Sequence, residues 1–122
     1  MTLFYGRGLA VVGATLSALA VWAVAAPVLD IDLAGTSTVV GPASVLAASL
    51  VAGFVAWALA ALLSRLTPRP HVVWRACAGI ALVLSLSGPL LGGFDAAATL
   101  VLVVMHLVVG GILLVWLAPS RA

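Results

Sequence analysis

The sequence predicts an all-α, polytopic membrane protein: one domain that forms an up-down bundle of four transmembrane helices, with the N and C termini cytoplasmic. Of its 122 residues, 66% are hydrophobic and only 7% are charged, whereas about 25% are charged in soluble domains. So short a chain cannot hide that much apolar surface from water. The few charges leave four long neutral segments, and about 20 apolar residues suffice for a membrane-spanning helix.

The first helix is predicted over residues 8–28. It starts after Arg7 and ends near Pro27, which is followed by a polar turn. An alternative is a cleavable signal peptide, because a basic residue, an apolar stretch and the small residues Ala23-Val24-Ala25 follow one another. The proline directly after these small residues, and an apolar stretch long enough to span the bilayer, favour a retained helix.

The second helix is predicted over residues 43–65. A polar, turn-prone stretch at residues 35–38 precedes it. Pro42 suits the first helical turn, where its missing N–H costs nothing. The helix ends at Arg65, because the proline-rich segment at residues 67–70 cannot continue it.

The third and fourth helices are predicted over residues 72–91 and 96–117. Gly88-Pro89 kinks or ends the third helix. Asp95 directly precedes the fourth helix. A carboxylate there meets free backbone N–H groups and the positive end of the helix dipole, so we expect Asp95 to be the N-cap.

The charges predict how the bundle is oriented. With four spans, every arginine falls on one side and every aspartate on the other. The arginines are Arg7, Arg65, Arg69, Arg75 and Arg121. The positive-inside rule makes their side cytoplasmic and places the protein in the inner (cytoplasmic) membrane as a multi-pass protein. The arginines are scattered and form no basic patch, so nucleic acid is not an expected partner.

His106 is the ionisable side chain that the sequence places deepest in the membrane. It lies about 15 Å into the fourth helix at 1.5 Å per residue, and such groups usually face a bundle interior or a cavity. Two hypotheses follow. The ring is a proton relay or ligand contact, or it is a structural imidazole bonded to a hydroxyl or carbonyl on a neighbouring helix. Candidate partners are Ser85, Ser87, Ser49, Thr15 and Ser17.

Three further residues are candidate companions of His106 in a ligand-binding or proton-relay site. Ser85 and Ser87 project about 200° apart, so only one of them can readily face His106. Trp57 lies near the middle of its helix, where its indole N–H needs a partner. A serine and a histidine invite a hydrolase interpretation, but no nucleophile elbow or orienting carboxylate accompanies them. We therefore expect no enzyme and no catalytic residue.

Three acids lie on the outer side, namely Asp30, Asp32 and Asp95. The first two could bind a cation or a basic partner, or could simply be solvated loop charges. A calcium loop needs more oxygen ligands than these provide. We expect no metal site and no cofactor.

The second helix carries a stripe of small residues that predicts close helix packing. Its members are Ala48, Ala52, Ala56 and Ala60, widened by Gly53. Small residues let helices approach closely in lipid. The stripe could serve packing within one chain, where Gly13, Ser17 and Gly110-Gly111 could receive it, or contact between chains.

Several segments taken together resemble a bacterial family of small four-helix integral membrane proteins that carries a domain of unknown function. The segments are Val21–Pro27, Val40–Pro42, Trp57–Leu59, Leu84–Leu90 and Met105–Val108. The resemblance covers nearly the whole chain. It implies the four-helix fold and brings no activity and no catalytic residue.

Three functions remain open on the sequence. The first is a non-enzymatic structural, accessory or oligomerising subunit, which packs against itself or a membrane protein partner in the lipid bilayer. The second is an oligomeric small-solute or proton transporter or channel with His106 at its midplane. The third is a membrane-embedded small-molecule binder or enzyme with a pocket near His106, Ser85 and Trp57.

Overall fold

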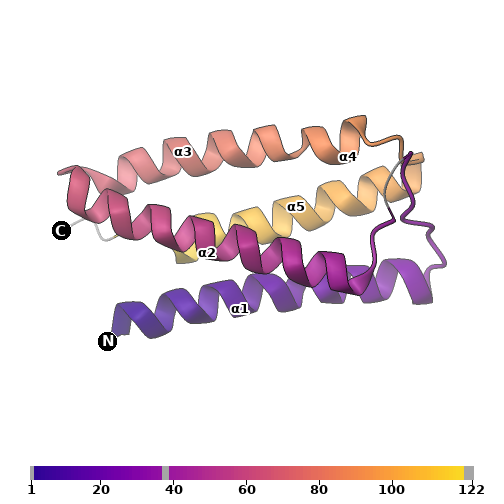
Figure 1. The fold of residues 1–122 in the computed structure, drawn as a ribbon, viewed down its shortest axis with the longest axis horizontal. Coiled ribbons are helices and arrows are strands. Elements are labelled where there is room, and N and C mark those ends of the chain that lie inside the picture. Colours follow the sequence, from indigo (N-terminus) through magenta and orange to yellow (C-terminus); the bar gives the residue numbers. More distant parts are fainter. Residues whose placement is uncertain (1, 37–38, 120–122) are drawn as a thin grey trace.

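Four long helical segments, each antiparallel to the next along the chain, form an elongated bundle (Figure 1). This computed structural model describes residues 2–36 and 39–119, except for the side chains of residues 2–5. The described residues contain no β-strand, so the predicted all-α, four-helix fold is confirmed. Each segment is long and apolar enough to cross a membrane. The elements are α1 (Thr2–Ala23), η1 (Val24–Val28), α2 (Pro42–Leu66), α3 (Pro70–Ser85), α4 (Ser87–Leu91) and α5 (Ala96–Trp116).

The first span starts earlier than predicted and ends in a widened turn. Helix α1 begins at Thr2 and passes through Arg7, because a charge bounds an apolar run without ending a helix. Pro27 lies inside η1. Since proline has no N–H to donate, the helix opens into a π turn, in which the Leu29 N–H donates to the Val24 carbonyl at 2.9 Å.

Two predicted helix starts are confirmed. Helix α2 begins at Pro42, in the first turn. Asp95 is the N-cap of α5, and its carboxylate accepts a hydrogen bond from the Ala98 N–H at 2.8 Å. Both devices supply what a helix start needs, since the first turn has N–H groups without helical partners.

The third span is divided at Leu86, between α3 and α4. Pro89 cannot donate to the carbonyl one turn earlier, so the helical ladder is interrupted there. The Leu86 N–H is shared between the Leu82 and Val83 carbonyls, at 3.2 and 3.3 Å. The interruption is therefore one turn long.

Helix α1 is the central packing element of the bundle and contacts both α2 and α5. Its Ala10 and Ala14 are 1% and 0% exposed and belong to a core that also includes Ala60, Trp74 and Leu117. A third (33%) of the most apolar window of the first span is buried, against 11% for the third span. The third span is therefore the most peripheral of the four.

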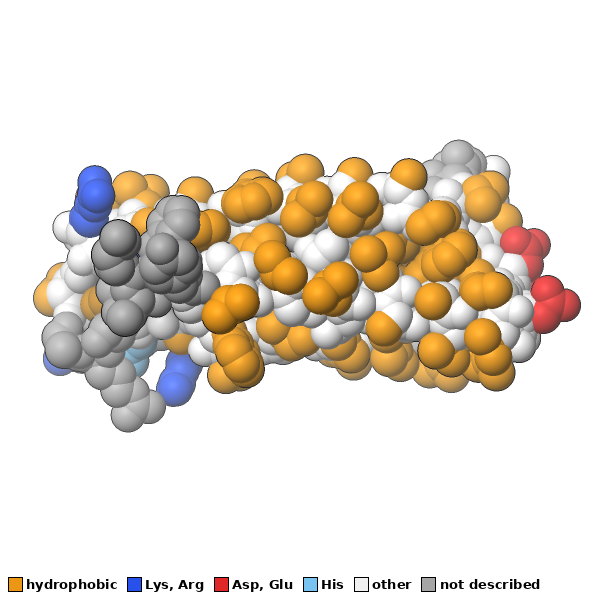
Figure 2. Space-filling model, turned by 90° about the horizontal axis from the view of Figure 1, so that it is seen from below, with side chains coloured by type: hydrophobic (Ala, Val, Ile, Leu, Met, Phe, Trp, Pro, Cys, Tyr) orange, Lys and Arg blue, Asp and Glu red, His pale blue; other side chains and the backbone are white. Residues whose placement is uncertain are grey.

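Charges separate to the two ends of the bundle. Figure 2 shows arginine side chains at one end and aspartate side chains at the other, with an apolar surface between them. Such a surface suits a lipid environment. Arg121 lies outside the described residues. Which end faces the cytoplasm stays a prediction from the charges.

Candidate ligand-binding cavity

A cavity of about 740 Å³ lies between α2, the α3–α4 span and α5. Small-molecule sites in proteins are typically about 300–1,000 Å³. Figure 1 shows α2 and α3–α4 diverging away from the hairpin that joins them. Lining residues on both sides of this gap, such as Ala52 and Ser85, are exposed. The cavity is therefore open toward the surrounding lipid.

The cavity exists because small residues line two of its walls. Ala48, Ala52 and Ala56 come from α2, and Ala78 and Ala81 come from α3. Short side chains on facing helices leave room where leucines would fill the gap. The α3 alanines escaped the sequence prediction, although a small-residue pair on the helix facing a small-residue stripe is a usable signal.

The predicted small-residue stripe of α2 serves two different faces. Gly53 packs against α1, where an added Cβ would lie 2.7 Å from Val11 Cγ1. Ala60 is 0% exposed in the core. By contrast, Ala48 and Ala52 are exposed and line the cavity. Of the glycines expected to receive the stripe, Gly110 instead lies against Leu82 of α3, and Gly13 has no side chain or neighbouring backbone within 4 Å of an added Cβ.

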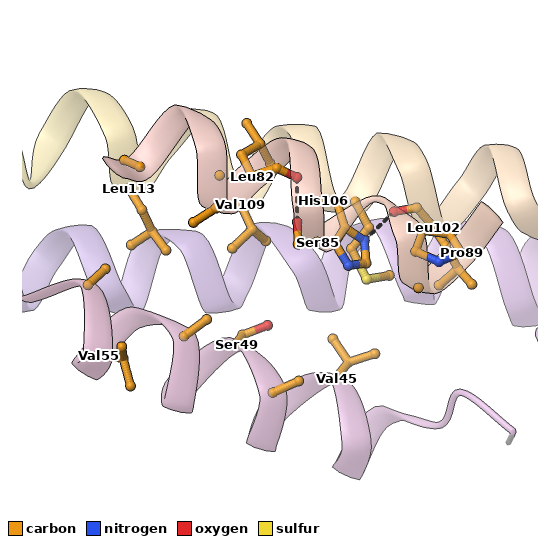
Figure 3. Close-up of a pocket in the computed structure, with 18 of the residues that line it drawn as sticks. Val45, Ser49, Val55, Leu82, Ser85, Pro89, Leu102, His106, Val109 and Leu113 are labelled. Atoms are coloured by element: carbon orange, nitrogen blue, oxygen red, sulfur yellow. Dashed lines mark hydrogen bonds between the residues drawn. The ribbon is translucent and has the colours of Figure 1, made fainter. Parts of the chain in front are cut away.

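His106 lines the cavity from α5. Its Nδ1 lies 2.7 Å from the carbonyl oxygen of Leu102, one turn earlier in the same helix (Figure 3). The expectation of a bond to a neighbouring helix was therefore wrong, because the imidazole reaches the carbonyl four residues back. The ring is partly buried, and its other nitrogen, Nε2, lies on the edge of the ring away from that carbonyl.

Three serines line the cavity with His106, and one of them, Ser44, lies in the first turn of α2 and donates to the Gly41 carbonyl at 2.8 Å. Ser85 lines it from α3, and its hydroxyl donates to the Leu82 carbonyl at 2.7 Å. Ser49 lines it from α2 and is 7% exposed. Figure 3 shows the Ser49 oxygen directed from α2 into the space that His106 faces from α5. The structure thus brings together His106, Ser85 and Ser49.

The other two candidate companions of His106 do not line the cavity. Ser87 is an exposed residue at the start of α4. Trp57 packs against the main core, with its ring stacked on Phe54 at a centroid distance of 6.2 Å. The opposed directions of Ser85 and Ser87 follow from their spacing, whereas the sequence could not fix the rotation of α2 that turns Trp57 away.

The end of the cavity near the aspartates, called the outer end after the predicted orientation, is lined by residues from the η1–α2 and α4–α5 connections, called the outer connections. Val40 precedes α2, and Phe94 precedes α5. The connections are joined by the Thr36 N–H, which donates to the Gly92 carbonyl at 3.0 Å. The indole of Trp22 holds the first connection by donating to the Val40 carbonyl at 2.9 Å. These contacts position the outer wall.

The three acids lie at this outer end, away from His106. Asp95 caps α5, while Asp30 and Asp32 are exposed in the connection after η1. Asp30 has a φ of 55°, a left-handed conformation that aspartate tolerates better than most residues. In residues 2–36 and 39–119, no three His, Cys, Asp or Glu side chains converge as a metal site would require.

Comparison with known proteins identifies a family and no activity. No curated protein and no solved structure is significantly similar to the chain. A family model described as "Family of unknown function (DUF6069)" matches residues 2–122. The match spans essentially the whole chain and agrees with the resemblance found in the sequence. The protein therefore belongs to the DUF6069 family of unknown function, as a membrane protein of four apolar helices.

Proposed function

We propose that this protein is a non-enzymatic membrane protein that binds one apolar small molecule, taken up from the bilayer through the gap between α2 and α3–α4. The observation that carries the proposal is the 740 Å³ cavity, lined by alanines and with His106, Ser49 and Ser85 among its walls. An apolar pocket with a few convergent polar groups is the usual form of a small-molecule site.

The size of the cavity favours a small molecule over a transmembrane helix. A 20-residue helix is 30 Å long and 10–12 Å across, which corresponds to roughly 3,000 Å³. The cavity has about 740 Å³. An inserted helix would have to push α2 and α3 apart, whereas a slender apolar molecule would need no such movement.

The absence of catalysis is part of the proposal. A hydrolytic or proton-transfer site orients its histidine with a carboxylate or an equivalent group. Here the imidazole is bonded to a backbone carbonyl, and the three aspartates are placed at the outer end. This arrangement supports binding, in which the polar groups orient a ligand, over chemistry on it.

The membrane and the orientation are also proposals. We place the protein in the cytoplasmic membrane with both termini inside, supported by arginines at one end of the bundle and aspartates at the other. Reporter fusions after the C-terminus and within the outer connection at residues 29–41 test this. The proposal requires cytoplasmic reporter activity for the first and external activity for the second.

A homo-oligomer or a partner membrane protein is the alternative that the open side of the cavity favours. The exposed small residues Ala48 and Ala52 would let a second helix approach closely. Two copies joined there would enclose a pathway beside His106, as a small-solute or proton transporter or channel requires. Cross-linking in lipid between cysteines placed at residue 52 would detect that arrangement.

Photolabelling with an alkane tests the binding proposal. The full-length protein is placed in phosphatidylcholine nanodiscs with a hexadecane that carries a mid-chain diazirine. After irradiation, the labelled residues are mapped by mass spectrometry. We expect labelling to concentrate on cavity residues such as Val45, Leu82 and Val109, several-fold above the exposed apolar residues of the outer faces.

A filled cavity provides the matched variant. Ala52→Leu combined with Ala81→Leu places two larger side chains in the cavity and should abolish its excess labelling. Ala58→Leu adds the same group at an exposed position of α2 that does not line the cavity, and should leave labelling unchanged. Uniform labelling of cavity and outer faces in the wild type would contradict the proposal.

A further inference from the structure

We infer that the bound molecule carries a neutral hydroxyl group, which binds between His106 of α5 and Ser49 of α2: the ligand is a lipid alcohol. This inference rests on the proposed function and adds the chemical class of the ligand. It follows from hydrogen-bonding capacity, because each of the two side chains keeps a donor or an acceptor that no group of the described residues uses.

His106 offers the cavity a hydrogen-bond acceptor. A backbone carbonyl can only accept, so the 2.7 Å contact with Leu102 places the ring proton on Nδ1. In the neutral imidazole, Nε2 then holds a lone pair and no proton. Nε2 has no hydrogen bond to any described residue.

Ser49 offers a hydroxyl without a partner. Serines in apolar helices commonly donate to a carbonyl one turn earlier. Ser64 does so at 2.9 Å, and Ser85 donates to Leu82 at 2.7 Å. The Ser49 hydroxyl makes no hydrogen bond with the described residues, although the residue is only 7% exposed. It is directed into the cavity (Figure 3).

A single hydroxyl group satisfies both side chains together. It donates its proton to His106 Nε2 and accepts the Ser49 proton through a lone pair. An ether, a ketone, an ester or an ionised carboxylate has no proton to give to Nε2, and an alkane serves neither group. Hydrogen bonds left unmade are costly in an apolar cavity, so the cavity discriminates between these classes.

The depth of the two residues separates this ligand from ordinary phospholipid. Ser49 and His106 are about 10 and 15 Å along their helices from the outer ends, at 1.5 Å per residue. A phospholipid with its headgroup at the surface presents only acyl chain at that depth. The ligand hydroxyl therefore lies within the hydrocarbon region, with apolar cavity wall on both sides of it along the bundle.

Three matched photoprobes test the inference. The full-length protein in phosphatidylcholine nanodiscs is labelled with diazirine-bearing hexadecanol, its methyl ether and hexadecane, with the diazirine at the same carbon. The hydrogen bond to His106 should raise labelling of the cavity by the alcohol roughly 3- to 10-fold above that by the ether, as the usual worth of one hydrogen bond implies. The ether should label it more than the alkane and less than the alcohol, because it can accept the Ser49 proton but cannot donate to His106.

Variants assign that preference to the two residues. His106→Leu should bring the alcohol-to-ether ratio close to one, because both probes can then only accept the Ser49 proton. Ser49→Ala should instead bring the ether-to-alkane ratio close to one and lower labelling by the alcohol, since both oxygen-bearing probes lose the same donor. Both variants should leave alkane labelling of the cavity in place. Ser64→Ala is the matched control, since Ser64 is bonded to its own helix and does not line the cavity. A thermal unfolding curve checks that His106→Leu is folded, and Ser49→Ala gives an independent answer.

The outcomes separate the two proposals. Equal labelling of the cavity by all three probes would overturn the hydroxyl inference and leave the binding proposal standing. A preference for the alcohol over the ether that survives His106→Leu would overturn it as well. Loss of cavity-selective labelling by every probe, including the alkane, would overturn the binding proposal and the inference with it.

Discussion

The two sides of the bundle differ in how closely their helices approach. On one side, α1 packs along α2 and α5 through small residues, with Ala14, Ala18 and Ala60 all 0% exposed. On the other side, α3 stands away from α2 and leaves a cavity between them. The compact side holds the bundle together, and the open side carries the candidate site.

The difference teaches that an alanine in a membrane helix has no fixed role. Lipid tails are as apolar as side chains, so helices associate in a bilayer through close van der Waals contact rather than through exclusion from water. Ala60 lies in the core with Ala10 and Ala14 of α1 and permits that contact. Ala52, two turns earlier in α2, faces the diverging α3 and leaves space instead.

Enlarging Ala60 and Ala52 should give the largest difference in stability between the two sides of the bundle. Ala60→Leu inserts three carbons into the packed core and should lower the free energy of unfolding by about 2–3 kcal/mol, the usual cost of overpacking. Ala52→Leu adds the same atoms to the cavity and should change stability by less than about 0.5 kcal/mol. Reversible unfolding in mixed micelles measures both values.

The difference between the unfolding free energies of the two variants is the informative quantity. If both variants were destabilised, the space around Ala52 would have to be filled by protein in the folded state, for example by a second copy of the chain. A pair of equally harmless variants would mean that α1 and α2 separate easily, which the buried contacts at Ala60 argue against.

Two glycines should give an intermediate effect. An alanine Cβ at Gly53 would lie 2.7 Å from Val11, whose β-branched side chain is held in one rotamer on a helix. Gly53→Ala should therefore cost about 1–2 kcal/mol. At Gly110 the neighbour is the end of Leu82, which lines the cavity and can turn into it. Gly110→Ala should cost less than about 0.5 kcal/mol.

Gly79→Ala calibrates the glycine pair. Gly79 lies in α3 with nothing within 4 Å of an added Cβ, so this variant reports helix propensity alone, which favours alanine by about 1 kcal/mol in water. Subtracting its effect isolates the steric part at each glycine. An equal steric cost at Gly110 and Gly53 would mean that Leu82 has no free space to turn into, and would contradict the proposed difference in packing between the two sides of the bundle.

The sequence predicted the spans well because each was marked by local chemistry. Asp95 caps α5 and Pro42 opens α2, as their residue types require. The start of α1 at Thr2 was missed, since Arg7 marks the end of an apolar run and not of a helix. Local signals thus gave the existence of every helix and most of the ends.

The site was only partly predictable, because it depends on how the helices are rotated and spaced. His106 was found from its cost in the membrane, and Ser49 and Ser85 were among its expected neighbours. Its actual partner, the Leu102 carbonyl, was missed. Every helical histidine has such a carbonyl one turn back, so no sequence signal marks the histidines that bond to it. Part of the α2 stripe packs against α1 and part of it lines the cavity. This division depends on the position of α3, and no local sequence pattern encodes that position.

A hydrogen bond between Trp74 and α5 limits how far α3 can move away from the rest of the bundle. Trp74 is 1% exposed, and its indole donates to the Leu114 carbonyl at 2.9 Å. Leu114 is in the last turn of α5, where carbonyls lack helical partners. Trp74→Phe keeps an aromatic ring and removes the donor, so it should cost about 1 kcal/mol. It should also raise the hydrogen exchange of α3 amides above that of α1 amides.

Trp116→Phe is the matched control. Trp116 lies in the last turn of α5, close in sequence to Leu114, but it is 65% exposed and should tolerate the change. A uniform rise in exchange over all four helices would mean that the bundle opens as one unit and that its two sides do not differ in stability. Exchange confined to α3 would mean that one indole, at the end remote from the outer connections, sets the width of the gap through which a ligand enters.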